Sequence, residues 1–182
     1  MRTLFLSLAV MALFVSGKQI DPNPLSDNDK KLAQLINDYR KKKNLAPIKI
    51  SVSLTKVAKT HCEDLEKYSK EIKKGCNPHS WSKHGKWTKV DYYPDHRNAK
   101  GMWDKPRELT EYKGNGYEIE CDGIKSPEEA LQLWKTSSGH NAVIIESGIW
   151  KKTDWQSMGV CMCNGFAVVW FGKEVDPAGY IK

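Results

Sequence analysis

The chain has 182 residues and a formal net charge of +7. A chain of this length predicts one domain with room for a substantial hydrophobic core. The only dense basic run, at residues 40–43, stands at the end of an expected helix, where cations are favoured. We interpret the charge as a lysine-rich surface and exclude a nucleic-acid partner, because no nucleic-acid-binding signature accompanies it.

The N-terminus has the pattern of a secretory signal. Arg2 gives a short basic start, residues 4–15 form a run that is apolar apart from Ser7, and Ser16-Gly17 offers small residues for cleavage. The run is too short to favour a membrane-spanning helix, and an uncleaved N-terminal anchor is the alternative. We therefore expect a signal peptide at 1–17, an extended leader at 18–26, and an extracellular or periplasmic mature protein that spans no membrane.

Export makes disulfides possible, and the chain contains five cysteines. Because the number is odd, at least one thiol stays free or pairs with another chain. We favour Cys62–Cys76, which would pin a helix to the loop behind it, and place Cys121 with Cys163 or Cys161 second. A cysteine zinc site is not expected, because the spacings match no common zinc finger.

Two amphipathic helices are predicted before residue 70. Residues 26–29 can cap the first helix, which should end near Asn44, and Ser53 can cap the second. The apolar face of the first helix contains Leu32, Leu35, Ile36 and Tyr39. The apolar face of the second contains Leu54, Val57, Ala58, His61, Leu65 and Tyr68. Since His61 lies on that face, we interpret it as a packed core histidine rather than a ligand.

Residues 81–113 show neither helical nor alternating periodicity, although tryptophans and tyrosines recur among lysines and aspartates. A loop of this length inside a compact domain is usually functional or carries short elements of its own. One interpretation is a cover over the core, held by aromatic side chains, and the other is an aromatic-lined groove for an apolar or sugar ligand. We favour the cover.

The last third of the chain contains the strongest local signals. Residues 117–121 alternate like a short strand, which places Glu118 and Glu120 on one face. Ser126 can cap a helix that Gly139 ends in a left-handed conformation, so His140 should lie just beyond a helix exit. A hairpin should follow, with its turn at 164–165 and a second strand covered on both faces. Residues 173–182 resemble a loose tail.

Taken in order, these segments resemble the CAP superfamily: cysteine-rich secretory proteins, antigen five and plant pathogenesis-related proteins. The resemblance covers residues 27–172 and is strongest to bacterial members. It rests on two N-terminal amphipathic helices, a closing Met-Gly-Val strand and a helix-end pattern. That pattern consists of Ser126-Pro127, Trp134, Ser137 and Gly139-His140-Asn141.

The resemblance implies an α+β fold, a three-layer α-β-α sandwich with a central antiparallel sheet. It also implies a cleft lined by two histidines and a glutamate, which carry over to His79, His140 and Glu118. Glu120 is the alternative to Glu118, because the usual Gly-Glu-Asn is changed here. The second glutamate of animal members is replaced by Ser137, so the acid–histidine tetrad is incomplete.

We therefore expect a secreted binding module rather than an enzyme, with a lipid, sterol, glycan or protein as its extracellular ligand. No cofactor is certain, but two neutral imidazoles and a carboxylate can hold Zn²⁺, with His79 and His140 as the metal ligands. A zinc-assisted hydrolase that uses the same cleft is the first alternative. A structural or adhesive extracellular protein is the second.

Overall fold

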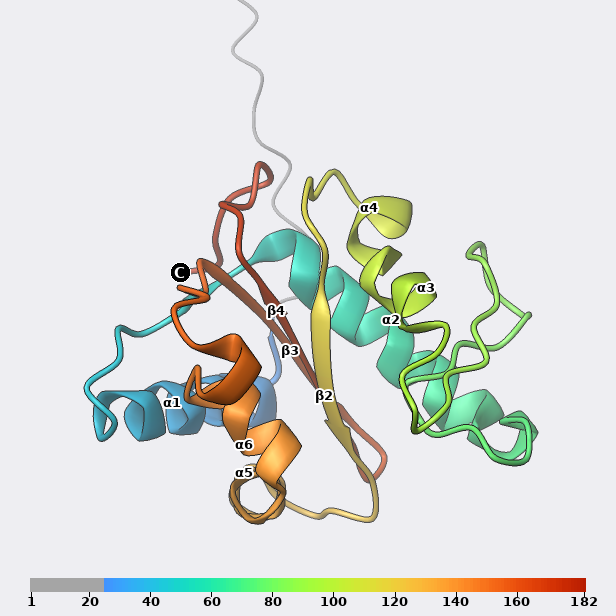
Figure 1. The fold of residues 1–182 in the computed structure, drawn as a ribbon, viewed down its shortest axis with the longest axis horizontal. Coiled ribbons are helices and arrows are strands. Elements are labelled where there is room, and N and C mark those ends of the chain that lie inside the picture. Colours follow the sequence, from blue (N-terminus) through green and yellow to red (C-terminus); the bar gives the residue numbers. More distant parts are fainter. Residues whose placement is uncertain (1–24) are drawn as a thin grey trace, which may run out of the picture.

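The computed structural model describes residues 25–182, which form a mixed four-stranded sheet with helices on both faces (Figure 1). The predicted signal peptide and most of the leader lie outside the described residues. The strands are β1 (Lys49–Ile50), β2 (Tyr117–Cys121), β3 (Ser157–Cys163) and β4 (Phe166–Gly172), in the order β1-β3-β4-β2. β2, β4 and β3 are antiparallel as expected, whereas the short β1 runs parallel to β3.

The two helical layers bury separate cores against the opposite faces of the sheet. One layer contains α1 (Asp27–Lys41), α5 (Pro127–Thr136), α6 (Ser138–Ile144) and η2 (Gly148–Trp150). The other contains α2 (Val52–Tyr68), η1 (Ser69–Glu71), α3 (Ala99–Trp103) and α4 (Lys105–Leu109). Along β4, Val169 and Phe171 belong to the first core, while Val168 and Trp170 belong to the second. The α-β-α sandwich is therefore confirmed.

The hairpin forms where the sequence predicts it. Asn164 and Gly165 both have positive φ, of 32° and 88°, and the ladder pairs Val160 with Val169. Because β4 has a helical layer on each side, every residue of the strand after Phe166 is buried.

α1 begins as predicted, whereas α2 begins two residues before the predicted position. Ser26 and Asp29 form a reciprocal capping box at the start of α1. In α2 the N-cap is Ser51, whose hydroxyl accepts from the Leu54 amide. Ser53, the predicted cap, instead donates from its hydroxyl to Asp176 at 2.8 Å.

The C-terminal segment is packed rather than loose, which corrects the expectation for residues 173–182. The Asp176 carboxylate is buried and accepts from the Ser51 hydroxyl at 2.5 Å and the Ser53 amide at 2.7 Å. Farther on, the Ile181 amide donates to the Ile50 carbonyl at 2.8 Å. A carboxylate at the N-terminus of a helix satisfies amides that the helix itself cannot, so the segment extends the cap of α2.

Asp176→Ala is expected to lower the free energy of unfolding by about 2–3 kcal/mol, because it leaves buried hydroxyls and amides without an acceptor. Urea denaturation measures this change. Glu174→Ala is the matched control, because Glu174 is exposed and forms its hydrogen bonds through backbone atoms. The free energy of unfolding of this variant should stay within about 0.5 kcal/mol of the parent. Equal effects of the two substitutions would show that the segment does not stabilise α2.

The helix that carries His140 is broken, which corrects the prediction that Gly139 ends it. α5 stops at Thr136, Ser137 is extended at ψ 115°, and α6 starts at Ser138 with Gly139 inside it. The break has a packing reason. Val143 lies nine residues after Trp134, so a continuous helix would point the two to opposite sides. Both are buried in the same core, and the bend at Ser137 allows this.

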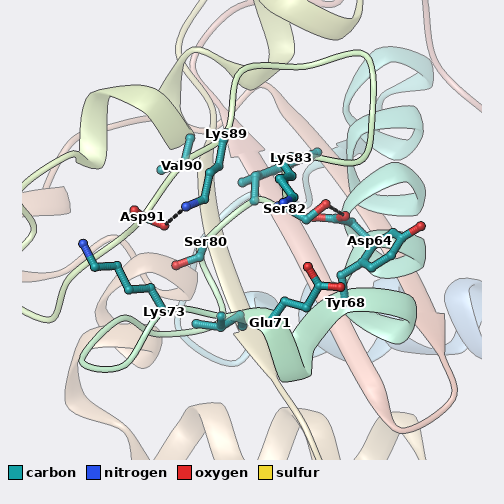
Figure 2. Close-up of a pocket in the computed structure, with 12 residues that line it drawn as sticks. Asp64, Tyr68, Glu71, Lys73, Ser80, Ser82, Lys83, Lys89, Val90 and Asp91 are labelled. Atoms are coloured by element: carbon teal, nitrogen blue, oxygen red, sulfur yellow. Dashed lines mark hydrogen bonds and ion pairs between the residues drawn. The ribbon is translucent and has the colours of Figure 1, made fainter.

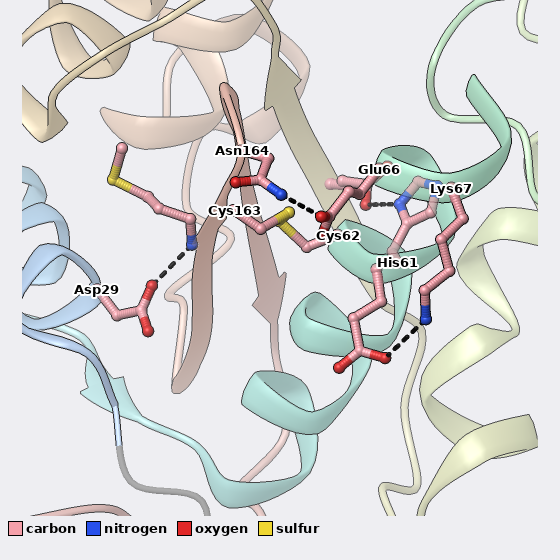
Figure 3. The surroundings of a disulfide bond; sticks show 10 residues. Asp29, His61, Cys62, Glu66, Lys67, Cys163 and Asn164 are labelled. Carbon is pink, nitrogen blue, oxygen red and sulfur yellow. Dashed lines mark hydrogen bonds and ion pairs between the residues drawn. A yellow bond between two sulfur atoms is a disulfide. The ribbon is translucent and has the colours of Figure 1, made fainter. Parts of the chain in front are cut away.

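The disulfide joins Cys62 of α2 to Cys163 at the end of β3, with the Cα atoms 6.1 Å apart (Figure 3). Both predicted pairings are wrong, since Cys76, Cys121 and Cys161 are free. Cys121 packs against the core on the α1 face, whereas Cys161 and Cys163 lie on the α2 face. The sheet therefore separates Cys121 from both of its predicted partners.

Residues 81–113 cover the α2 face, as the favoured interpretation predicts. An isolated bridge pairs Trp81 with Val90, and both side chains are buried in the core that α2 forms with the sheet. Met102 of α3 and Tyr112 enter the same core. The segment is also stabilised internally by Lys105, whose buried ammonium donates to the Thr88 carbonyl and the Glu108 carboxylate.

Candidate ligand-contacting site at His79 and His140

The site is built on Glu118, a buried residue of the sheet-edge strand β2. Its strand partner Trp170 belongs to the core on the α2 face, so the Glu118 side chain points toward α2. The two carboxylate oxygens accept from different histidines, one from α2 and one from the loop that follows η1. A buried carboxylate with two such partners remains ionised, and its pKa is lowered because attraction to His61 and hydrogen bonds from both histidines outweigh burial.

His61 is an imidazolium, as its partners show. Its Nδ1 lies 2.6 Å from Glu118 Oε1 and its Nε2 lies 3.0 Å from the Ser80 carbonyl oxygen. Both oxygens can only accept, so both ring nitrogens must donate. Burial alone would lower the pKa of His61, but the charge and hydrogen bond of Glu118 raise it above its usual 6.5. The ring also stacks on Trp81, with centroids 4.2 Å apart.

The ring of His79 is oriented by the second oxygen of Glu118. Its Nδ1 lies 2.8 Å from Glu118 Oε2, so Nδ1 donates, and its Nε2 has no hydrogen-bond partner among residues 25–182. The loop is fixed by Asn77, whose side chain accepts from the His79 amide and whose amide donates to the Tyr92 carbonyl. The Glu118 carboxylate therefore orients this imidazole and sets which nitrogen faces outward.

His140 approaches the same point from the other helical layer. It lies in the first turn of α6, and its ring centroid is 6.3 Å from that of His79. Its ring forms no hydrogen bond within residues 25–182. Burial and the neighbouring His79 lower its pKa to about 4, against a smaller opposing effect of Glu118. At neutral pH His140 is therefore an uncharged imidazole with an available lone pair.

α6 is fixed to α1 around this histidine. The Tyr39 hydroxyl donates to Asn141, and the buried Arg40 donates to the Ile144 carbonyl at 2.7 Å and to Glu146 at 2.8 Å. Two of these contacts are made to α6 and the third to the residues just after it, which leaves the helix little freedom to rotate, so His140 keeps a defined direction.

The low pKa of His140 gives a pH dependence whose sign can be worked out. Between pH 6.5 and about 4 the unfolded chain binds a proton here that the folded protein does not. The stability of the folded protein with a neutral His140 is thus fully present above pH 6.5 and is lost as the pH falls toward 4. We expect an NMR titration midpoint for His140 near pH 4 and a shallower acid loss of stability in His140→Asn. A midpoint near 6.5 would contradict this burial.

Glu120, the alternative to Glu118, does not contact the histidines. It is buried on the same face of β2, and its Oε1 has no hydrogen-bond partner among the described residues. Burial, together with the charges of Glu118 and Asp122, raises its pKa to about 8. It is therefore a protonated acid at neutral pH, and Glu118 is the glutamate of the site.

The structure brings His79, Glu118 and His140 together, with the Glu118 carboxylate hydrogen-bonded to His79. Both oxygens of Glu118 accept N–H groups, which makes it the residue that orients a histidine rather than a third ligand. Across residues 25–182, no group of three or more histidine, cysteine or acidic side chains is arranged to hold a metal ion. Catalytic zinc sites generally use three protein ligands, and these residues do not supply them.

Sequence reasoning placed His61 correctly in the core but missed its part in the site. A signal was available, because a fully buried imidazole must find polar partners and a strand glutamate was the obvious candidate. What the sequence could not show is that β2 lies beside α2 at this point.

Comparison with known proteins adds the family. The model of the cysteine-rich secretory protein family, CAP, matches residues 33–171. The chain belongs to the CAP family. This CAP domain is 25% identical over 128 residues to the uncharacterized protein YkwD of Bacillus subtilis, a match that spans 68% of the chain but only 40% of YkwD.

Solved structures share the fold of this CAP domain. An outer surface protein from Borrelia burgdorferi has a TM-score of 0.56 at 21% identity, over 85% of this chain and 96% of that one. An extracellular SCP-domain protein from Bacillus anthracis has a TM-score of 0.56 at 16% identity, over 84% and 45%. A cysteine-rich secretory protein from Staphylococcus aureus has a TM-score of 0.52 at 16% identity, over 85% and 42%. Within residues 25–182, no helix of this domain is both long and apolar enough to cross a membrane.

Proposed function

We propose that this CAP-domain protein is a secreted binding module whose ligand is contacted by the imidazole nitrogens of His79 and His140 that have no hydrogen-bond partner in the protein. The observation that carries the proposal is the use of both Glu118 oxygens, which fixes His79 with Nδ1 donating and Nε2 free. Burying the Glu118–His61 ion pair costs desolvation free energy that packing alone does not require. Here the ion pair also orients the ring of His79 at the surface.

The chemistry of the two imidazoles narrows the ligand class. His140 is uncharged at neutral pH and offers a hydrogen-bond acceptor, so the site favours a ligand that presents hydroxyl or N–H donors. Among lipids, sterols, glycans and proteins, a glycan offers the densest set of hydroxyl donors. We therefore place a glycan first.

Export is part of the same proposal. The N-terminal pattern of residues 1–17 supports a cleaved signal, and the Cys62–Cys163 disulfide is suited to an oxidising compartment. N-terminal sequencing of the protein recovered from culture medium tests this: a start near Lys18 supports export, and retention of Met1 in cells contradicts it.

A zinc-assisted hydrolase has less support. The attack of a metal-activated water requires an ion held by several protein ligands, and Glu118 is committed to two histidines. Zinc retained after dialysis against a chelator and lost in His79→Ala, together with hydrolytic turnover, would favour the enzyme over the binding module.

The binding proposal is tested by titrating the full chain with chitotriose, maltotriose and cholesteryl sulfate while the histidine ring resonances are followed. We expect one probe to shift the His79 and His140 signals saturably. His79→Ala or His140→Ala should weaken that binding at least about tenfold. His84→Ala is the control, because His84 stacks on Tyr68 and pairs with Glu71 away from the site. Shifts that persist in both site variants, or no shift with any probe, would overturn the proposal.

A further inference from the structure

The dense basic run at residues 40–43 consists of one buried and three exposed side chains. Arg40 is buried and donates to the Ile144 carbonyl and the Glu146 carboxylate, so its charge is used inside the protein. The three lysines that follow it are exposed at the C-terminal end of α1 and form no ion pair within residues 25–182. Cations are favoured at the end of a helix, which accounts for their position but leaves their charges free to meet a partner.

A fourth lysine reaches the same place from the neighbouring helix. α1 and α5 lie side by side, and Lys31 pairs with Glu128 at 3.8 Å near the start of both helices. Near their ends, the ammonium groups of Lys43 and Lys135 lie 5.7 Å and 5.2 Å from the centroid of the same ring, that of Tyr39. Neither ammonium forms an ion pair within the described part of the chain. Charges along this seam are thus paired at one end and unpaired at the other.

The exposed surface formed by Tyr39, Lys41, Lys42, Lys43 and Lys135 is called the Tyr39 patch below. Its neighbouring carboxylates do not cancel its charge. Asp38 is exposed beside the patch and forms no ion pair with these lysines, and Glu146 is already bound to Arg40. Four lysines against the one available carboxylate leave an excess of three positive charges.

The hollow between α2, η1 and the loop at residues 80–91 shows the opposite arrangement (Figure 2). There Lys89 lies 2.9 Å from Asp91, and the carboxylates of Asp64 and Glu71 line the same hollow. Since lysines and acids alternate, that surface has no preference for an anion. The Tyr39 patch has one because its cations are gathered without matching acids.

The Tyr39 patch is joined to the candidate site through α6. The Tyr39 hydroxyl donates to the Asn141 side chain at 3.1 Å, and Asn141 directly follows His140. A chain of sugar units that contacts His140 can therefore continue along the start of α6 to the lysines.

We propose that the Tyr39 patch binds acidic groups of the same ligand, which makes that ligand an acidic polysaccharide rather than a neutral one. The inference rests on the proposed function and names the class of glycan. Lysine ammonium groups act as point charges and accept carboxylate and phosphate groups alike. A lipid surface fits less well, because the large hydrophobic side chains that are exposed within residues 25–182, Leu133, Ile149 and Val175, do not belong to the patch.

The test is a calorimetric titration of the full chain with hexagalacturonate and with its neutral methyl ester. We expect the acid form to bind at least about tenfold more tightly at low salt, and the difference to shrink as salt screens the charges. Phosphorylated maltohexaose, compared with maltohexaose, separates phosphate from carboxylate recognition. Lys43→Gln/Lys135→Gln should remove most of the difference between acid and neutral forms. Lys56→Gln/Lys74→Gln is the matched control, because both lysines are exposed, lie on the α2 side of the sheet and carry the same charge.

Tighter binding of an acid form that is lost in the patch variant and kept in the control supports the proposal. Equal affinities for acid and neutral forms, or equal losses in the two double variants, would overturn it. Tighter binding of poly-L-glutamate or of phosphatidylglycerol vesicles through the same lysines would also overturn it, because the partner would then be a protein or a lipid.

The outcome for the proposed function is read separately, from the histidine signals. If chitotriose shifts the His140 signal while the acid forms bind no more tightly than the neutral ones, this inference fails and the proposed function stands. If hexagalacturonate binds through Lys43 and Lys135 and leaves the histidine signals unmoved, the patch stands and the proposed function fails.

Discussion

Glu118→Ala is expected to lower the free energy of unfolding by about 3–5 kcal/mol, because it leaves a buried imidazolium without its counter-ion. His61 is fully buried, and its Nδ1 would lose the oxygen that now lies 2.6 Å away. His79 would at the same time lose the hydrogen bond that fixes its ring, and would turn freely. One substitution should thus destabilise the core and disorder the proposed ligand contact.

Glu118→Gln should cost far less, about 1–2 kcal/mol, because an amide can satisfy both neighbours. Its NH₂ group can donate to a neutral His61 while its oxygen still accepts from His79. The buried ion pair then disappears. The contrast between alanine and glutamine separates the need for hydrogen bonds from the need for charge.

The pH dependence of that contrast has a defined window. The raised pKa of His61 gives stability that is complete below pH 6.5 and is lost as the pH rises through the folded value. The lowered pKa of Glu118 gives stability that is complete above pH 4.5 and is lost as the pH falls through the folded value. The stability difference between the parent and Glu118→Gln should therefore be largest between pH 4.5 and 6.5.

Urea denaturation across this range measures the difference. Glu120→Gln is the matched control, because Glu120 is buried on the same face of the same strand but is neutral, and its effect should stay within about 1 kcal/mol. A difference that does not vary with pH would show that His61 and Glu118 are not an ion pair.

Cys62→Ser is expected to cost about 5 kcal/mol, the loop-closure value for a disulfide whose cysteines lie 101 residues apart. The bond ties α2 to the hairpin, so its loss should free one edge of the helix that carries His61. Cys163→Ser should have the same effect, and the double variant should be no worse than either single one.

Thermal and urea unfolding under non-reducing conditions check this prediction. Cys76→Ser is the control, since Cys76 is free in the loop after η1 and should change stability by no more than about 0.5 kcal/mol. Mass spectrometry that finds Cys62 joined to Cys76 would contradict the structure and restore the pairing favoured by sequence.

Local patterns predicted much of the fold. Ser26 and Asp29 set the start of α1, and Asn164-Gly165 set the hairpin turn, because each acts within a few residues of chain. The strand at 117–121 and the direction shared by Glu118 and Glu120 follow from alternation alone. The resemblance to the CAP family supplied the arrangement of these parts in three layers.

The errors concern contacts between distant segments. The disulfide partner of Cys62 depends on where α2 crosses β3, which no local pattern encodes. The break at Ser137 depends on two side chains reaching one core. Asp176 caps α2 from more than a hundred residues away, so the C-terminal segment looked unattached in the sequence.

The candidate site divides in the same way. His79, Glu118 and His140 were identified, and the structure brings them together. Their roles were not, because a carboxylate beside two histidines can be a metal ligand or a hydrogen-bond acceptor. Only the position of His61 decides between the two.

The central claim is that Glu118 holds His61 as an imidazolium and orients His79 by accepting from its Nδ1, and the ¹⁵N imidazole spectrum at pH 6 tests it most directly. We predict both nitrogens of His61 protonated, a proton on Nδ1 of His79, and His140 neutral. A neutral His61, or a His79 ring without a proton on Nδ1, would contradict the account.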